Sequence, residues 1–152
     1  MPTKSTPAKT RRSRARVSVQ NASRALQVPA ARLFRAWVNE AIASPIEVTV
    51  RLVGSAEGRR LNRAYRGRDY ATNVLTFAYE PAVGDIVLCP AIVAREAREQ
   101  GKSLAAHYAH LTIHAILHLR GYDHVRAADA ARMERAEVRI LRRLGLPNPY
   151  LI

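Results

Sequence analysis

The sequence predicts a single α+β domain in which a mixed sheet of about four strands packs with about five helices. The length of 152 residues suits one domain, and the 48% hydrophobic content is sufficient for a core. Short segments of alternating apolar residues are interspersed with longer segments of helical apolar spacing, as in α+β proteins. We expect residues 1–16 to form a disordered basic arm and residues 17–152 to form the folded domain.

The first half of the domain contains two predicted strands separated by a helix. Val17 and Val19 alternate with polar residues, which indicates a short first strand. Residues 29–43 begin with a proline and carry apolar residues at helical spacing, so they should form an amphipathic helix. Residues 48–52 alternate again and predict a half-buried strand.

A second helix and a hairpin should follow. Ser55 can cap a helix that runs to about Tyr65. Residues 73–79 and 84–89 are rich in strand-forming residues, and we expect them to be joined by a turn that contains Pro81 and Gly84.

Three helices complete the predicted domain. Residues 90–100 form the first, which Gly101 ends. The second spans about 103–119, and the third about 127–144. Cys89 cannot form an internal disulfide because the chain contains one cysteine, and its apolar neighbours predict a buried thiol in a reducing compartment.

The net charge of +13 is concentrated partly at the N-terminus. An arm without acidic residues gains affinity for nucleic acid by releasing counterions. A solubilising tail remains an alternative, whereas a transit peptide is disfavoured because the first 14 residues lack an apolar helical face. The six basic residues of the arm are Lys4, Lys9, Arg11, Arg12, Arg14 and Arg16.

The sequence contains neither an apolar segment of membrane-spanning length nor a hydrophobic signal segment. We therefore expect a soluble, cytoplasmic protein with no membrane partner.

The segment HAILHLRGYDH, residues 114–124, predicts a metal site. His114 and His118 are four residues apart, so both side chains project from one face of a helix. Gly121 can end that helix and turn the chain back, which brings His124 toward the same ion. Three protein ligands leave a position open for water, as in catalytic zinc sites.

The chemistry of this ligand set favours a phosphate ester over a peptide bond. The usual HExxH motif has a glutamate as general base, but Ala115 occupies that position here. Three neutral ligands leave the ion its full charge, which attracts anions and acidifies a bound water.

The alternative to a metal site is three histidines that only pack or form hydrogen bonds. Imidazole also suits copper, nickel and iron, so the ligands alone do not identify zinc.

Two further histidines share the helical stripe of His114 and His118. His107 lies about 10.5 Å along the axis from His114, too far to share its ion. His110 is one turn from His114 and could support a ligand or move protons. We favour packing or hydrogen bonding to the sheet for both residues.

Arginines are concentrated between residues 51 and 68, where Glu57 is the acidic residue among them. Most of these arginines fit a solvated helix face with a general attraction for phosphate. Arg66 is distinguished by its context, LNRAYRGRDYATNVLTF. The full set is Arg51, Arg59, Arg60, Arg63, Arg66 and Arg68.

Three blocks of the chain together resemble the YbeY endoribonucleases, also called rRNA maturation factors. HAILHLRGYDH resembles that family's HGxLHLxGYDH signature, and LNRAYRGRDYATNVLTF and GDIVLC resemble its two other blocks in the same order, within residues 46–150. The resemblance implies an endoribonuclease that uses one zinc ion and cleaves single-stranded RNA. It also implies that the protein acts on ribosomal particles, both in the maturation of ribosomal RNA, including the 16S 3′ end, and in ribosome quality control. The implied zinc ligands are His114, His118 and His124, and the implied catalytic arginine is Arg66.

The chain departs from the family pattern at two places. Ala115 replaces a glycine, which could crowd a neighbouring backbone, and Tyr70-Ala71 replaces a residue-proline step, which could loosen the loop after Arg66. No general base stands out, and Asp69 and Asp123 are candidates by proximity alone. Asp123 could instead orient a ligand or the loop.

Two other function classes stay open at this point. One is a metal hydrolase of another type, such as a protease, which the missing glutamate disfavours. The other is a non-catalytic ribosome-assembly factor in which zinc organises the fold. The sequence also leaves open whether RNA is preferred to single-stranded DNA, and the oligomeric state.

Overall fold

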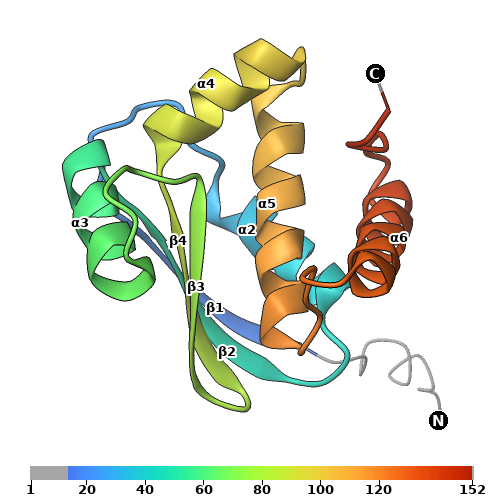
Figure 1. Cartoon of the computed structure of the whole chain (residues 1–152). Helices are drawn as coiled ribbons and strands as arrows, with labels where there is room; N and C mark the ends of the chain where they lie inside the picture. Colours follow the sequence, from blue (N-terminus) through green and yellow to red (C-terminus); the bar gives the residue numbers. More distant parts are fainter. Residues whose placement is uncertain (1–13, 152) are drawn as a thin grey trace, which may run out of the picture.

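The structure of the chain, a computed structural model, describes residues 14–151 and contains one mixed sheet with the strand order β1-β2-β4-β3 (Figure 1). β1, β2 and β4 are parallel, and β3 pairs antiparallel with β4 at the edge of the sheet. Within this part of the chain, four strands and five helices confirm the predicted α+β class. In chain order the elements are β1 (Ala15–Asn21), α2 (Ala31–Ala41), β2 (Ile46–Leu52), α3 (Ser55–Arg66), β3 (Val74–Glu80), β4 (Val83–Leu88), α4 (Pro90–Gln100), α5 (Leu104–Leu119) and α6 (Ala127–Arg143).

Alternating side chains give the sheet an inner and an outer face. In β2, Val50 and Leu52 are fully buried, whereas Glu47 is exposed. Val50 pairs with Ile86 of β4, which is also fully buried, so the apolar face continues across the sheet. Period-two patterning therefore places the core on one side of these strands.

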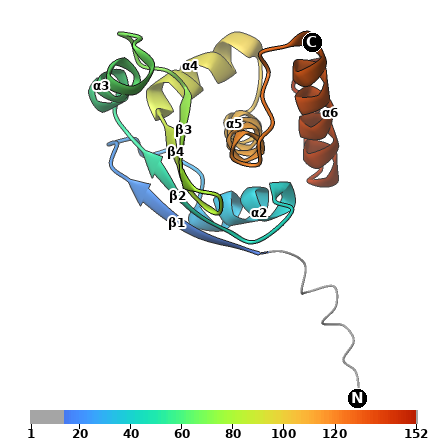
Figure 2. The same cartoon turned by 60° about the horizontal axis from the view of Figure 1, so that its bottom comes forward.

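Helix α5 is the centre of the layer on the inner face. It contacts α2, α4, α6, β3 and β4. Figure 2 shows α2 and α5 on one side of the sheet, α6 beyond α5, and α3 on the opposite side. Tyr108 of α5 is fully buried and meets Phe34 of α2 edge to face, with 6.1 Å between ring centroids.

Helix α3 covers part of the outer face with a smaller apolar cluster. Its Leu61 packs with Phe77 against the buried residues Val53, Leu75 and Val87. This separate cluster keeps α3 next to the edge strand β3. This packing sets the position of Arg66, because Arg66 is the last residue of α3.

The first strand begins two residues earlier than the sequence predicts. Ala15 pairs with Ile46 of β2, and its backbone N–H donates to Oδ1 of Asn39 at 2.7 Å. Arg16 continues the ladder. Ala15 and Arg16 thus belong to β1, while residues 1–13 of the expected arm lie outside the described residues.

The start of α3 also differs from the prediction. Gly54 occupies the N-cap position, and Ser55 is the first helical residue, without a capping hydrogen bond from its side chain. The Ser55 hydroxyl instead lies 3.9 Å from the Sγ atom of Cys89. Cys89 is 1% exposed, which confirms the expected buried thiol.

Gly84 lies in strand β4 and not in the turn where it was expected. A Cβ atom at Gly84 would come within 2.9 Å of both the Leu119 side chain and the Phe77 carbonyl oxygen. The glycine thus lets the end of α5 approach the sheet closely. Turn signals in the sequence cannot distinguish this packing role from a role in a turn.

His107 is packed in the interior, as expected, but its hydrogen-bond partner lies on α4 and not in the sheet. It is 3% exposed, and its Nε2 atom lies 2.9 Å from Oε1 of Glu96. The same oxygen accepts a hydrogen bond of 2.9 Å from the side-chain amide of Asn73. Burial lowers the pKa of His107, although Glu96 opposes that shift.

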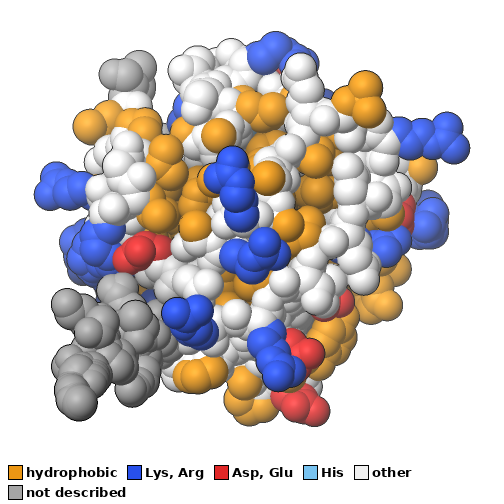
Figure 3. All heavy atoms as spheres, turned by 180° about the vertical axis from the view of Figure 1, so that it is seen from behind, with side chains coloured by type: hydrophobic (Ala, Val, Ile, Leu, Met, Phe, Trp, Pro, Cys, Tyr) orange, Lys and Arg blue, Asp and Glu red, His pale blue; other side chains and the backbone are white. Residues whose placement is uncertain are grey.

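The surface is strongly basic. On the side opposite to the view of Figure 1, blue lysine and arginine side chains are spread between hydrophobic ones, with few acidic neighbours (Figure 3). No helix among residues 14–151 is long and apolar enough to cross a membrane.

We expect the substitution Gly84→Ala to destabilise the fold by about 1–3 kcal/mol, because the Phe77 backbone cannot move as freely as a side chain. Urea denaturation of the purified protein measures the change. Gly58→Ala in α3 is the matched control, since its Cβ would make contacts of 3.7 Å and alanine favours a helix. Equal stability of the Gly84→Ala variant and the parent protein would contradict the close approach.

Acidification should destabilise the protein in part through His107. Because its pKa is lowered in the folded state, the unfolded chain binds more protons once the pH falls below about 6.5, and stability is lost in that range. His107→Gln retains a donor for Glu96 but does not titrate. Denaturation at pH 7.5 and 5.5, with a chelator present, should show a smaller pH dependence for this variant. An unchanged dependence would show that His107 is not responsible.

Candidate metal centre

Helix α5 positions two of the three histidines that the sequence singles out. The helix begins after Ser103, whose hydroxyl oxygen accepts a hydrogen bond of 3.1 Å from the N–H of Ala106. His114 and His118 lie one turn apart near its other end, with 4.7 Å between their ring centroids. The four-residue spacing therefore places both imidazoles together, as predicted.

Gly121 directs the chain back toward these two histidines. Its φ of +99° is in the region that favours glycine, and its N–H donates to the His118 carbonyl at 3.0 Å. The N–H of Tyr122 donates to the Leu117 carbonyl at 2.9 Å, which completes a Schellman motif. The expected helix stop at Gly121 is confirmed.

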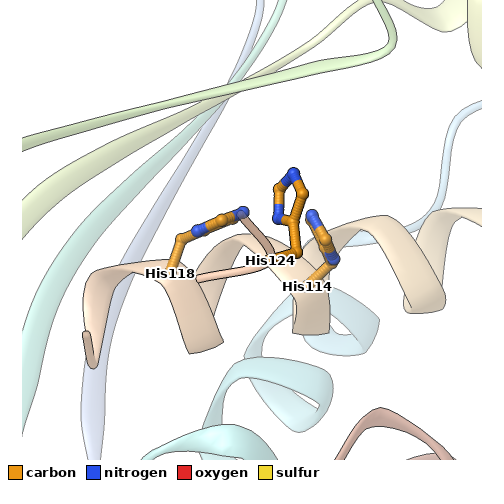
Figure 4. A group of neighbouring side chains, drawn as sticks. All are labelled: His114, His118 and His124. Carbon is orange, nitrogen blue, oxygen red and sulfur yellow. The ribbon is translucent and has the colours of Figure 1, made fainter. Parts of the chain in front are cut away.

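The turn after Gly121 brings His124 to the other two rings. Its ring centroid lies 5.5 Å from that of His114 and 4.9 Å from that of His118, and Figure 4 shows the three side chains around one space. One potential ligand atom of each histidine lies within 4.8 Å of the others, near enough for one metal ion to be held between them. Oδ1 of Asp123 accepts a hydrogen bond of 3.1 Å from the N–H of Val125, so Asp123 shapes this loop.

The rings of His114 and His118 are oriented by acceptors behind them. Nδ1 of His114 contacts Oε2 of Glu137, and Nδ1 of His118 lies 3.1 Å from the Tyr122 carbonyl oxygen. Carboxylate and carbonyl oxygens only accept, so in each ring Nδ1 carries the proton and the lone pair is on Nε2. Such an arrangement is typical of histidines that bind a metal through Nε2.

Glu137 is a central residue of this site that the sequence analysis missed. It is fully buried on α6, where its carboxylate contacts His110, His114 and the hydroxyl of Tyr150. Burial alone would raise the pKa of Glu137, but the hydrogen bonds from His110, His114 and Tyr150 outweigh it and lower the pKa to about 2. A signal was present, because Glu137 interrupts the apolar stripe of Met133, Ala136, Ile140 and Leu141.

His110 supports this carboxylate from α5. Its Nε2 lies 3.0 Å from Oε1 of Glu137 and 3.3 Å from the Tyr150 hydroxyl. His110 is largely buried, as the favoured packing role requires, but its hydrogen-bond partners come from α6 and the C-terminal segment and not from the sheet. Its contact with the carboxylate behind His114 fits the alternative, in which His110 supports a ligand.

Arg66 and the three histidines line the same cavity of about 500 Å³. Nη2 of Arg66 donates to the Thr76 carbonyl of β3 at 3.0 Å, and its guanidinium carbon lies 5.8 Å from the centre of the Phe77 ring. The edge strand β3 forms one wall of this cavity. The other lining residues are Asn73, Val74, Leu75, Ala78 and Leu119, together with Thr76.

Asp69 does not share this cavity, although it follows Arg66 closely in the sequence. Its carboxylate accepts hydrogen bonds of 2.7 and 3.0 Å from Arg59 and lies 3.6 Å from Arg63. The hydrogen bond from Arg59 lowers the pKa of Asp69. Asp69 therefore organises the outer side of α3.

The two departures from the family pattern are accommodated. Ala115 is 1% exposed and packs in the main core. The Tyr70 carbonyl accepts a hydrogen bond of 2.8 Å from the buried side chain of Asn62, which holds the loop after Arg66.

Comparisons with known proteins agree on one family. A family model described as Endoribonuclease YbeY matches residues 15–145. A protein of that name from Nitrosomonas europaea is 53% identical over 139 residues, which are 90% of this chain and 85% of that protein. Another from Aromatoleum aromaticum is 58% identical over 125 residues, or 80% and 81% of the two chains.

A solved structure shares the fold. The solution structure of a Thermotoga maritima protein superposes with a TM-score of 0.55 at 28% identity, covering 84% of this chain and 91% of that one. Together with the match over residues 15–145, these similarities establish that the chain belongs to the Endoribonuclease YbeY family.

Proposed function

We propose that the protein is a zinc-dependent endoribonuclease that hydrolyses single-stranded RNA in ribosomal RNA maturation, including the 16S 3′ end, and that it acts on ribosomal particles. The observation that carries the proposal is the joint presence of three histidines and Arg66 in one cavity. Membership of the endoribonuclease family supplies the class of reaction.

The proposed metal ligands are His114, His118 and His124. A metal ligand must be neutral, and burial together with the nearby His114 and His124 lowers the pKa of His118, which favours its neutral form. The proton on Nδ1 of His114 is held by Glu137, so Nε2 is available to an ion. When bound, a divalent ion polarises a phosphoryl oxygen and lowers the pKa of a water molecule.

Arg66 is the proposed catalytic residue of the chain. Its contact with Thr76 uses Nη2, and the guanidinium has further N–H donors that can bind a phosphoryl oxygen. An arginine stays charged at all relevant pH values, so it can stabilise negative charge that develops on the phosphate during cleavage. The wall of β3 fixes its position relative to the histidines.

The two alternatives fit the site less well. A protease of the HExxH type needs a carboxylate at position 115, but Ala115 is buried there. Glu137 is fully buried and is already engaged by His110 and His114. A zinc that only organises the fold is disfavoured because α5 already packs against α2, α4, α6 and the sheet, away from the end that lines the cavity.

Removal of the carboxylate behind His114 should weaken zinc binding. We expect Glu137→Gln to reduce the affinity about 10- to 100-fold, because a neutral amide orients the imidazole less strongly. Competition with a chromophoric chelator at pH 7.5 measures the affinity. Glu134→Gln, on the exposed side of the same helix, is the control and should bind zinc normally. Equal affinities for both variants would contradict the role of Glu137.

Substitution of Arg66 should slow the chemical step itself. We expect Arg66→Ala to reduce single-turnover cleavage of a saturating single-stranded RNA about 100- to 1,000-fold, as for the loss of one donor to the transition state. Arg60→Ala, an exposed arginine of the same helix, controls for the loss of one positive charge. If Arg66→Ala weakened binding but left the cleavage of bound RNA intact, its catalytic role would have to be abandoned.

His114→Ala distinguishes the enzyme from a non-catalytic assembly factor. We expect this variant to lose RNA cleavage while it retains its circular dichroism spectrum and its binding to ribosomal particles, since His110 and Tyr150 still form hydrogen bonds with the buried Glu137 carboxylate. Loss of the fold together with the metal would instead favour a structural zinc.

A further inference from the structure

Three aromatic side chains gather beside the metal cavity, on the outer face of the sheet. The rings of Tyr65 on α3 and Phe77 on β3 meet edge to face, with 5.2 Å between their centroids. Tyr79 follows in β3, where a bulge between Ala78 and Glu80 shifts the register. In Figures 1 and 2 α3 lies beside β3 at the side of the molecule away from α6.

Packing in the core does not explain why aromatic residues occupy these positions, because two of the three rings are largely exposed. Tyr65 is 62% exposed although its ring meets Phe77, and Tyr79 is 63% exposed. Phe77 is half-buried and packs against that cluster. Exposed aromatic rings gathered on one part of the surface are typical of surfaces that bind a partner.

Tyr79 is held in place and does not move as a free side chain. Its hydroxyl donates to Oδ2 of Asp85 at 2.7 Å. This hydrogen bond, together with burial, the charge of Asp85 and the neighbouring Tyr65, raises the pKa of Tyr79, which stays neutral. The hydrogen bond to Asp85 thus holds the Tyr79 side chain before any ligand binds, and Tyr65 is near enough to influence its pKa.

Arg66 links these aromatic rings to the metal cavity. Its guanidinium carbon lies 5.8 Å from the Phe77 ring centre, while its Nη2 reaches the carbonyl of Thr76, which lines the cavity. Thr76 and Phe77 are successive residues of β3, so their side chains project to opposite faces of the sheet. Arg66 contacts the Thr76 backbone and the Phe77 ring, and therefore lies across the edge of β3. β3 is the last strand of the sheet on this side.

We propose that Tyr65, Phe77 and Tyr79 form a stacking platform for an unpaired nucleobase of the RNA strand whose phosphate lies in the metal cavity. This inference rests on the proposed function and names the substrate feature that the site recognises. The strand backbone passes Arg66 at the edge of β3, and the next base stacks on the exposed Tyr65 ring. Aromatic side chains bind bases of any sequence in this way, because every base has a π-face.

The platform gives a physical reason for preference of single strands. In a duplex each base is already stacked and paired, so its face is not available to Tyr65 without unstacking. We choose RNA over a protein partner because the residues around the platform are positively charged and because the platform adjoins the metal cavity. Arg66 joins the platform to the histidines, and the exposed Arg60 lies on the same helix as Tyr65.

Substrates with abasic residues test the platform directly. With the zinc-loaded full chain, an abasic residue at one position beside the cleaved bond should raise KM about 5- to 100-fold, the range for the loss of one stacked base. Tyr65→Leu keeps an apolar contact with Phe77 but lacks the flat ring. It should raise KM by a similar factor on the intact RNA with little change in kcat, and the abasic penalty at that position should disappear.

Two matched variants complete the experiment. Tyr65→Phe should restore binding and the abasic penalty, because stacking does not need the hydroxyl. Tyr70→Leu removes another exposed tyrosine, 52% exposed on the following loop, and should behave as the parent protein. The proposal is overturned if, at every abasic position, the increase in KM for Tyr65→Leu with the abasic RNA equals the product of the two separate increases. It is also overturned if duplex RNA competes as well as single-stranded RNA.

Failure of the platform can be distinguished from failure of the proposed function. If the parent protein cleaves no RNA, the proposed endoribonuclease function is wrong. Fluorescence anisotropy with the same intact and abasic oligonucleotides still measures the coupling between Tyr65 and the base. If cleavage is normal and this coupling is absent, the platform alone is wrong.

Discussion

The buried carboxylate of Glu137 is the interaction on which the arrangement of the site depends. A charged group without access to water must be satisfied by hydrogen bonds, and Glu137 obtains them from His110, His114 and Tyr150. These partners come from α5 and from the C-terminal segment, while the carboxylate itself is on α6. The same contacts therefore fix the position of α6 against α5 and the orientation of the ring that faces the cavity.

The histidine stripe of α5 has different tasks along its length. His107 joins α4 through Glu96, His110 joins α6 through Glu137, and His114 and His118 face the cavity with His124. A regular spacing of three and four residues places all of these on one side of a helix, but it does not determine which element lies opposite each ring. The opposing layer makes the difference: α4 at the beginning of α5, α6 in the middle and an open cleft at the end.

Local patterns predicted what depends on local geometry. The bounds of α4, from Pro90 to Gln100, and the turn at Gly121 follow from residues that are close in sequence. Glu137 and Tyr150 were missed because their roles depend on contacts between residues 13 to 40 positions apart. Gly84 was assigned to a turn, since no local signal reveals that Leu119 packs against it. Among the arginines, tertiary contacts separate Arg66 in the cavity from Arg59, which pairs with Asp69.

The contact between Arg66 and the Thr76 carbonyl has a consequence for the behaviour of the protein in solution. β3 is an edge strand, and an open edge offers unpaired backbone groups that can recruit a strand from another chain. A long cationic side chain laid across that edge blocks such recruitment. The guanidinium thus occupies a backbone acceptor that an added strand would need, and its charge at the open edge disfavours pairing with another chain.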